Sequence, residues 1–178
     1  HKLNGPKGVG ALICNPDLTV EPLQWGGGQE QGLRPGTLPV PLIIGFAKAA
    51  ELAQSDLASR SQRIERLRNR LWGSLKQRQP TLLLNGHATV RLPHNLNITI
   101  PGVSGSKLQR ALRSRVACSS GSACSRGEPS HVLMALGHSR QEAEASLRLS
   151  LGRSTSDRDI DQAIQAINDV IHQLRHKP

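Results

Sequence analysis

Cys124 is the residue whose type and neighbours most favour chemistry. It lies in the run SSGSACS, residues 119–125, which is made of small and polar side chains with almost nothing to pack. We expect a thiol in such a segment to be exposed and mobile, as a nucleophile that moves between two places must be. A structural cysteine, in contrast, normally lies in apolar packing. A loop cysteine without a function is the alternative that this pattern leaves open.

The other two cysteines are expected to be packed residues without a catalytic role. Cys14 follows Ile13 in an apolar run that predicts a short buried strand, and Cys118 is expected at the base of the loop that carries Cys124. Three cysteines make an odd number without metal-ligand spacing, and the sequence shows neither a signal peptide nor a long apolar run. A reducing cytoplasm fits this pattern best.

Lys2 is a second candidate for reactivity. It precedes a glycine- and proline-rich turn, GPKGVG at residues 5–10, and the predicted strand after it. A lysine that loses hydration at the edge of a sheet becomes a better nucleophile and can form a Schiff base. A solvated lysine near the end of the sequence is the simpler alternative.

Charge and composition limit the classes of function. The 178 residues suffice for one domain or two small ones, with 37% hydrophobic residues, 2% aromatic residues and a formal net charge of +10. The densest basic stretch alternates with leucine and isoleucine at helical spacing and comprises Arg60, Arg63, Arg66, Arg68, Arg70, Lys76 and Arg78. It predicts the solvated face of an amphipathic helix. Nucleic-acid binding is disfavoured because no aromatic residues interleave with the charges, and an acidic partner protein is a further alternative.

These residues must be positioned by a mixture of short strands and helices. The glycine-rich run at residues 26–37 predicts a loop, and residues 40–79 predict one long helix or two with a break near Ser55. Strand patterns cover residues 11–14, 81–84, 88–92, 96–100 and 147–151. Further helices are predicted at 104–113, between Pro129 and Gly137, after the capping-box pair Ser139 and Glu142, and along an apolar stripe from Ile160 to Leu174.

Three segments in a fixed order carry a resemblance to a known family. They are HKLNGPKG at residues 1–8, GGGQEQGLRPGT at 26–37 and SSGSAC at 119–124, with further similar segments at 92–97, 128–133 and 147–153. Together they resemble the NifS/IscS-type cysteine desulfurases, which are class V, fold-type I pyridoxal-phosphate enzymes. The resemblance runs over nearly the whole chain.

The resemblance implies an α/β fold, the C-terminal part of a fold-type I transferase. Residues 1–38 would be a remnant of the large cofactor-binding domain, 39–80 a linking helix, and 81–178 a small α+β domain with a sheet covered by helices. Family members carry a further N-terminal part, and position 1 is a histidine. We therefore expect the 178 residues alone to be inactive, as a fragment, a subunit of a split protein or a remnant.

The resemblance also assigns roles at the site. Lys2 would bond to pyridoxal 5'-phosphate and move protons, His1 would lie against the cofactor phosphate, and Thr37 would bind the phosphate of the other subunit's cofactor in a homodimer. Arg148 would hold the substrate carboxylate, and Cys124 would accept sulfur. Without the resemblance, Thr37 is equally well a helix cap and Arg148 a cation on an edge strand. Gln29 and Arg34 receive positioning roles only.

The implied activity converts L-cysteine to L-alanine and leaves a persulfide on Cys124. The form of the loop resembles the long-loop group of the family, which implies direct transfer to a scaffold or other sulfur acceptor, for iron–sulfur clusters and other sulfur-containing cofactors. We expect no resident metal, no nucleic acid and no membrane, with Cys124 a candidate for transient iron–sulfur ligation. The alternatives are a selenocysteine lyase, a class V aminotransferase, which needs no loop thiol, and a truncated homologue that only binds proteins.

Overall fold

The chain is divided into two compact units. A computed structural model describes residues 1–119 and 128–176. The first unit is His1–Leu57 and the second is Ala58–Pro178, and each is described here by itself. The three-part division expected from the sequence, with boundaries near residues 38 and 80, concerns a longer family fold and stays a prediction.

The first unit consists of a long irregular segment and one helix. A single 3-10 turn, η1 (Gln29–Gly32), interrupts the glycine-rich loop, and helix α1 (Val40–Ser55) follows. The amino-terminal turn packs closely on α1: a Cβ added to Gly5 would lie 3.1 Å from Ala49 Cβ, and one added to Gly45 would lie 3.1 Å from the ring of Pro6. These two glycines let the turn and the helix approach each other.

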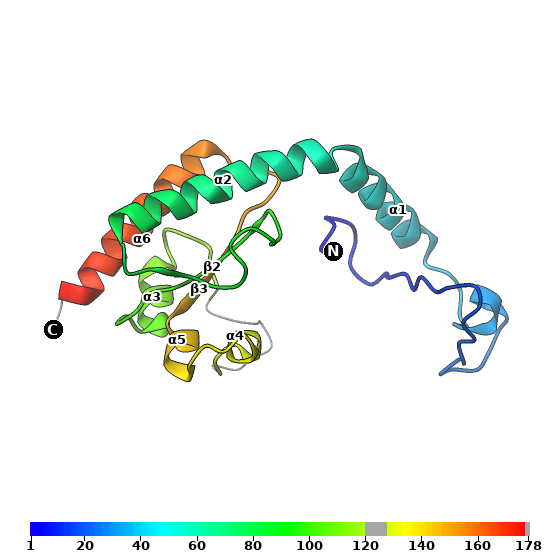
Figure 1. Ribbon diagram of the computed structural model, residues 1–178. Coiled ribbons are helices and arrows are strands. Elements are labelled where there is room, and N and C mark those ends of the chain that lie inside the picture. Colours follow the sequence, from blue (N-terminus) through cyan, green and yellow to red (C-terminus); the bar gives the residue numbers. More distant parts are fainter. Residues whose placement is uncertain (120–127, 177–178) are drawn as a thin grey trace. The chain divides into compact units, whose positions relative to one another are not determined.

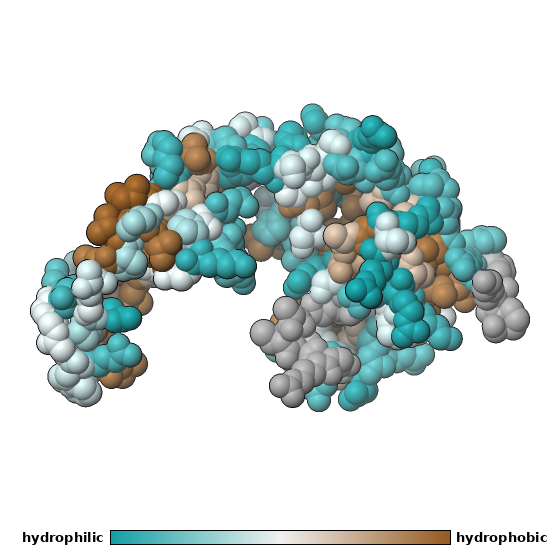
Figure 2. Space-filling view, turned by 180° about the vertical axis from the view of Figure 1, so that it is seen from behind, coloured by the Kyte–Doolittle hydropathy of each residue, from teal (hydrophilic) through white to brown (hydrophobic). Residues whose placement is uncertain are grey.

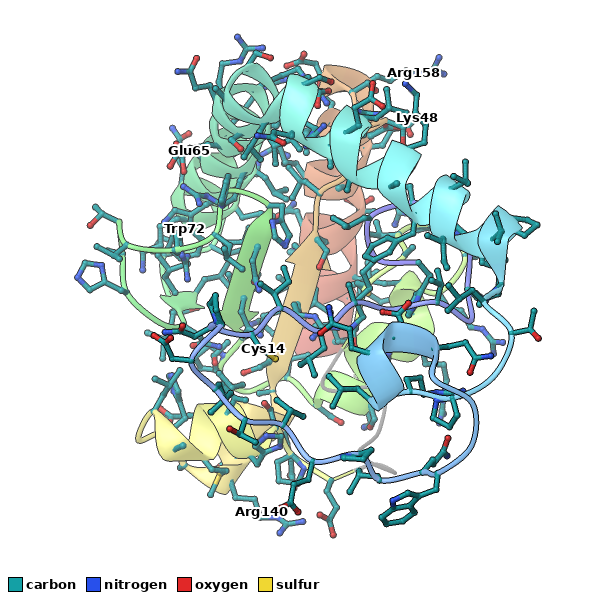
Figure 3. The ribbon with its side chains drawn as sticks, turned by 90° about the vertical axis from the view of Figure 1, so that its right-hand side faces the viewer. Cys14, Lys48, Glu65, Trp72, Arg140 and Arg158 are labelled. Atoms are coloured by element: carbon teal, nitrogen blue, oxygen red, sulfur yellow. The ribbon has the colours of Figure 1, made fainter. Side chains whose placement is uncertain are left out.

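The predicted strand at residues 11–14 is wrong. The segment has no regular secondary structure, and within residues 1–57, all of which the structure describes, there is no strand. Leu12 and Ile13 are 77% and 94% exposed, and Cys14 is exposed rather than buried (Figure 3). An apolar run becomes a strand only where a neighbour completes its hydrogen bonds, and this unit supplies none.

Two helices, rather than one, cover residues 40–78. Helix α1 ends at Ser55, Asp56 leaves helical geometry with φ −119° and ψ 13°, and helix α2 (Leu57–Arg78) begins directly after it. The sequence had left both possibilities open, with a break near Ser55 as the second. Pro80 follows the end of α2, as expected of a residue that lacks the N–H a helix needs.

The second unit is built on a small antiparallel sheet. Its strands are β1 (Leu83–Leu84), β2 (Asn95–Thr99) and β3 (Ser146–Ser150), in the order β1-β2-β3 (Figure 1). The predicted strand at residues 88–92 is wrong. There the His87 ring nitrogen Nδ1 accepts hydrogen bonds from the backbone N–H groups of Thr89 and Val90, so the segment turns back instead of extending.

Helices cover the apolar face of this sheet. Helices α2, α3 (Gly105–Leu112) and α6 (Asp157–His176) contribute to one core with the strands, while the short helices α4 (His131–Ala135) and α5 (Arg140–Glu144) precede β3 (Figure 1). The fully buried side chains of this core include Leu67, Leu71, Leu75, Leu96, Ile98, Leu108, Leu112, Leu147, Ile167 and Ile171. The predicted apolar stripe of the C-terminal helix is confirmed.

Two arginines of α2, Arg68 and Arg70, form hydrogen bonds or ion pairs with other segments of the second unit. Arg70 forms ion pairs with Asp157 at 3.0 Å and Asp161 at 2.6 Å, which tie α2 to the first turn of α6. Arg68 is only 4% exposed and donates to the Leu92 carbonyl oxygen at 3.0 Å, so its assignment to a solvated face is wrong. Helical spacing could not reveal this, because the loop that Arg68 binds is distant in sequence.

The surface of α1 carries exposed apolar side chains, shown as brown atoms over this helix in Figure 2. They include Val40, Ile44 and Leu52. Among the described residues, none of the helices combines the length and apolar character needed to cross a membrane.

A matched pair of glycine substitutions tests the packing of the second unit. A Cβ at Gly105 would overlap the Glu144 carbonyl oxygen, whereas a Cβ at Gly73 in α2 meets nothing within 4 Å. We expect Gly105→Ala to lower the free energy of unfolding by about 1–3 kcal/mol or more, because neither backbone can give way. Gly73→Ala should raise it by about 0.5–1 kcal/mol. Urea denaturation measures both, and equal effects would contradict the packing.

The start of α5 makes a pH-dependent contribution to stability. Ser139 and Glu142 form the predicted capping box, and hydrogen bonds from the Ser139 backbone and hydroxyl lower the pKa of the Glu142 carboxyl. A lowered folded-state pKa means that the stabilisation is present above the ordinary carboxyl range and is lost as the pH falls through the lowered pKa. The stability difference between the wild type and Glu142→Gln should therefore shrink between pH 7 and about pH 3. A difference that stays constant in urea denaturation would contradict this.

Candidate functional site

One face of the sheet is polar, and it forms the floor of the candidate site. Alternate residues of β2 and β3 point to this face, and the register places Asn97 opposite Arg148 and Thr99 opposite Ser146. Such opposite residues have neighbouring side chains in an antiparallel pair. The polar alternation therefore gathers side chains that the sequence separates by about fifty positions.

A buried hydrogen-bond network fixes one end of this polar face. The Asn85 amide donates to Asn97 Oδ1 at 2.7 Å and to Ser146 Oγ at 3.2 Å, and it accepts from Thr99 Oγ1 at 3.0 Å. Ser146 Oγ in turn donates to the Glu142 carbonyl oxygen at 2.8 Å, which joins the network to the end of α5. Each buried polar group is thus satisfied, and the network holds the three strand segments in one register.

The rest of the polar face opens into a pocket of about 340 Å³. Arg148 and Asn97 form part of its floor, the loop at residues 85–92 forms one side, and α4 contributes an apolar wall. The guanidinium of Arg148 makes no hydrogen bond or ion pair with any residue that the structure describes. This planar fork is therefore available to a carboxylate.

Arg148 also anchors the segment that leads to Cys124. Its backbone exchanges two hydrogen bonds with Ser119: Ser119 N–H donates to the Arg148 oxygen at 3.1 Å, and Arg148 N–H donates to the Ser119 oxygen at 2.6 Å. Cys124 itself lies outside the described residues. In the sequence Cys124 follows Ser119 by five residues, and five residues of fully extended chain span at most about 18 Å.

Cys118 is a packed residue of the second unit. It is half-buried against the core of the second unit, and burial raises the pKa of its thiol. A raised pKa leaves less thiolate, which is the reactive form. Cys118 was expected to be buried, and the structure shows it half-buried.

The other predicted site residues belong to the first unit. His1, Lys2 and Thr37 are all exposed. Lys2 lies in a turn closed by the Asn4 N–H, which donates to the His1 carbonyl oxygen at 3.1 Å, with Asn4 at φ 63°. Thr37 is not a helix cap, because the residue before α1 is Pro39 and no side chain caps that helix. The structure thus removes the alternative role of Thr37 and leaves its hydroxyl exposed.

The side chains of His1, Lys2 and Thr37 are of types that can bind a phosphorylated aldehyde. An exposed primary amine can form a Schiff base with the aldehyde, and a hydroxyl and an imidazole can bind phosphate oxygens. Lys2 makes no ion pair with a described residue, so its amine is free to react. These residues are compatible with pyridoxal 5'-phosphate.

Gln29 holds the glycine-rich loop together, as its expected positioning role requires. Its Oε1 accepts a hydrogen bond from the Gly36 backbone N–H at 3.0 Å, seven residues away. A Cβ at Gly27 would lie 2.5 Å from the same Gln29 oxygen, so a larger residue there would displace the Gln29 side chain. Arg34 donates to the carbonyl oxygen of Pro35.

Sequence reasoning missed the polar lining of the pocket. Asn85, Arg91 and Asn97 were not singled out, although the alternation of Asn95, Asn97 and Thr99 in β2 was a signal of a polar sheet face. What the alternation could not show is that helices leave part of this face open. Among the described residues, no group of three or more acidic, histidine or cysteine side chains is placed to hold a metal ion.

Comparisons with known proteins agree on one family. The family model for Aminotransferase class-V matches residues 1–163. The chain is 43% identical to a cysteine desulfurase IscS of Shewanella sp. (strain W3-18-1) and 44% identical to one of Aeromonas salmonicida (strain A449), over 98% of this chain and 44% of each relative. A solved NifS-like protein has a TM-score of 0.86 and 32% identity, over 98% of this chain and 45% of its own. The chain therefore spans less than half the length of these relatives.

Loss of the buried network should be costly to the second unit. Asn85→Ala removes hydrogen bonds from the buried Thr99 and Ser146 and from the half-buried Asn97, so we expect the free energy of unfolding to fall by about 2–3 kcal/mol. Gln77→Ala, which alters an exposed residue of α2, is the control and should change it by less than about 0.5 kcal/mol. Thermal or urea unfolding distinguishes the two, and an Asn85→Ala variant as stable as the control would refute the network's role.

Proposed function

Because the chain belongs to the class-V aminotransferase family, we propose that it is the C-terminal part of a pyridoxal-phosphate-dependent cysteine desulfurase. The observation that carries the proposal is the pairing of Arg148 with Ser119. It supports the proposal because Arg148, whose guanidinium would bind a carboxylate, lies beside Ser119, five residues before Cys124 in the sequence. The edge strand of the sheet would thus supply the arginine that binds the amino-acid carboxylate and would pair with the segment that leads to the sulfur-accepting thiol.

Residues of the first unit would hold the cofactor. Lys2 would bond to it covalently and carry a proton to and from the substrate carbon, while His1 and Thr37 would bind its phosphate. When bound, pyridoxal 5'-phosphate supplies an electron sink. The exposed positions of these three side chains support the assignment.

Residues of the second unit would orient the substrate and take its sulfur. The guanidinium of Arg148 would bind the carboxylate of L-cysteine through two parallel hydrogen bonds. The Cys124 thiolate would attack the substrate sulfur, so that a sulfur–sulfur bond forms as the carbon–sulfur bond breaks. The carbon takes a proton and leaves as L-alanine, and Cys124 keeps the sulfur as a persulfide.

Sulfur delivery would follow from the length of the tether. Because Cys124 lies five residues beyond the anchored Ser119, its thiol could leave the substrate pocket and meet an acceptor protein. We further propose a homodimer, in which Thr37 binds the phosphate of the other subunit's cofactor. The persulfide would supply iron–sulfur cluster assembly and the synthesis of other sulfur-containing cofactors.

A chimera tests the sulfur-accepting role directly. In it, this chain replaces the corresponding part of the Shewanella IscS relative, which provides the remaining length. With cofactor bound, visible as absorbance near about 420 nm, we expect alanine from L-cysteine and one additional sulfur on Cys124 by mass spectrometry. Cys124→Ala should abolish the persulfide but retain the absorbance.

Cys118→Ala is the matched control, because it removes a thiol six residues away that packs against the core. It should keep both alanine production and the persulfide. A chimera that binds cofactor and cysteine but yields the same alanine and sulfide with and without Cys124 would refute the proposal.

Arg148→Lys tests the carboxylate-binding role in the same chimera. A lysine keeps the charge but loses the bidentate fork, so we expect KM for L-cysteine to rise about tenfold or more, with the cofactor absorbance unchanged. Steady-state kinetics measures the change. An unaltered KM would show that Arg148 does not hold the substrate.

A further inference from the structure

One side of helix α3 carries a row of three cations. Lys107, Arg110 and Arg113 follow one another at three-residue spacing and are all exposed. The buried residues Leu108 and Leu112 lie on the opposite side of the helix, which packs against α6 and β3. None of the three cations forms an ion pair with a residue that the structure describes. We call these three residues the basic face of α3.

The surroundings of α3 do not neutralise the basic face. Residues 66–127 contain neither aspartate nor glutamate. The carboxylates of α6 are already bound by Arg70, Arg115 or Ser156. Glu144, whose backbone lies against the start of α3, pairs with another residue of α5. The described elements that pack against α3 therefore leave no carboxylate for the basic face.

Helix stability does not account for the row. Lys107 lies in the first turn of α3, beside the positive end of the helix dipole, where a cation is unfavourable. Arg110 lies in the last turn, where a cation is favourable, but like charges three residues away repel it. Carboxylates of a binding partner would relieve this repulsion. The row is thus better explained by binding than by folding.

The end of α3 is held in a fixed arrangement with the start of the thiol-bearing segment. The Val116 N–H donates to the Leu112 carbonyl oxygen at 2.9 Å, which closes the helix with a tight turn. Val116 and Cys118 pack against the core, and Ser119 then pairs with Arg148. A protein bound to the basic face is therefore kept close to the point from which that segment departs.

We propose that the basic face of α3 docks an acidic surface of the protein that accepts sulfur, an inference that rests on the proposed desulfurase function. Lys107 and Arg113 are separated by six residues, or about 9 Å of helix, so carboxylates along one side of a partner helix can match the row. Each exposed ion pair adds little affinity, but several together steer and orient a partner.

A protein fits this surface better than RNA does. Residues 101–119 contain no aromatic side chain, so α3 and the segment after it offer no surface on which a base could stack. Recognition of single-stranded RNA depends largely on such stacking. What the basic face offers is charge at helical spacing, which complements an acidic protein surface.

Fluorescence anisotropy with the cofactor-free 178-residue chain tests the docking surface. The probe is a labelled helical peptide with glutamates along one side at three- and four-residue spacing. We expect the double variant Arg110→Gln, Arg113→Gln to bind the peptide about tenfold more weakly than the wild type, and added salt to reduce the difference. Because both residues are exposed and glutamine is a good helix former, the free energy of unfolding should stay close to that of the wild type.

The double variant Arg66→Gln, Arg158→Gln is the matched control. It removes the same charge from exposed positions of α2 and the first turn of α6, and Arg158 lies eleven residues, or about 16 Å of helix, before the Asp169 that pairs with Arg115. Its peptide affinity should change by less than about twofold. Equal weakening by the two variants would show that only net charge matters, and would overturn the proposal.

Two further outcomes decide between this proposal and its rivals. Absence of peptide binding at low salt would refute the docking surface, and a single-stranded RNA of equal charge that binds more tightly through Arg110 would assign it to nucleic acid instead. Failure of the desulfurase proposal looks different: the chimera would form no persulfide on Cys124, while the peptide still bound to α3. A chimera that forms the persulfide, with peptide binding indifferent to Arg110 and Arg113, refutes the docking surface alone.

Discussion

The antiparallel pairing of β2 with β3 is the constraint on which the second unit depends. It turns Leu96, Ile98 and Leu147 toward the helices and, by the same alternation, turns Asn97 and Arg148 to the opposite face. A shift of one residue in the register would bury the polar set and expose the apolar one. The core and the candidate site are therefore two consequences of one register.

The arginines of the second unit differ in whether their side chains have partners within the fold. Arg63 donates to the carbonyl oxygens of Arg153 and Thr155 and so fixes the segment that leaves β3, while Arg70 ties α2 to α6. Arg148, in contrast, has no described side-chain partner. Several of the cations that make up the net charge of +10 thus form hydrogen bonds or ion pairs within the fold.

How far sequence reasoning succeeded depended on the range of the interactions involved. The capping box of Ser139 and Glu142 and the stripe of Ile160, Ile164 and Ile167 were predicted correctly, because each needs only neighbours along one helix. The strand predicted at residues 11–14 failed because pairing requires a distant partner. Arg68 was misplaced for the same reason, since its carbonyl acceptor lies 24 residues away.

By itself, the sequence determined the family resemblance and named Lys2, Thr37, Cys124 and Arg148, because motif order is a property of the chain alone. Only the tertiary structure decided that Ser119, beside the thiol segment, pairs with Arg148, and that Arg91 reaches the same pocket. Those neighbours are created by strand register and by loop closure over a sheet face. Both depend on which distant segments satisfy each other's backbone hydrogen bonds, and no local pattern specifies that choice.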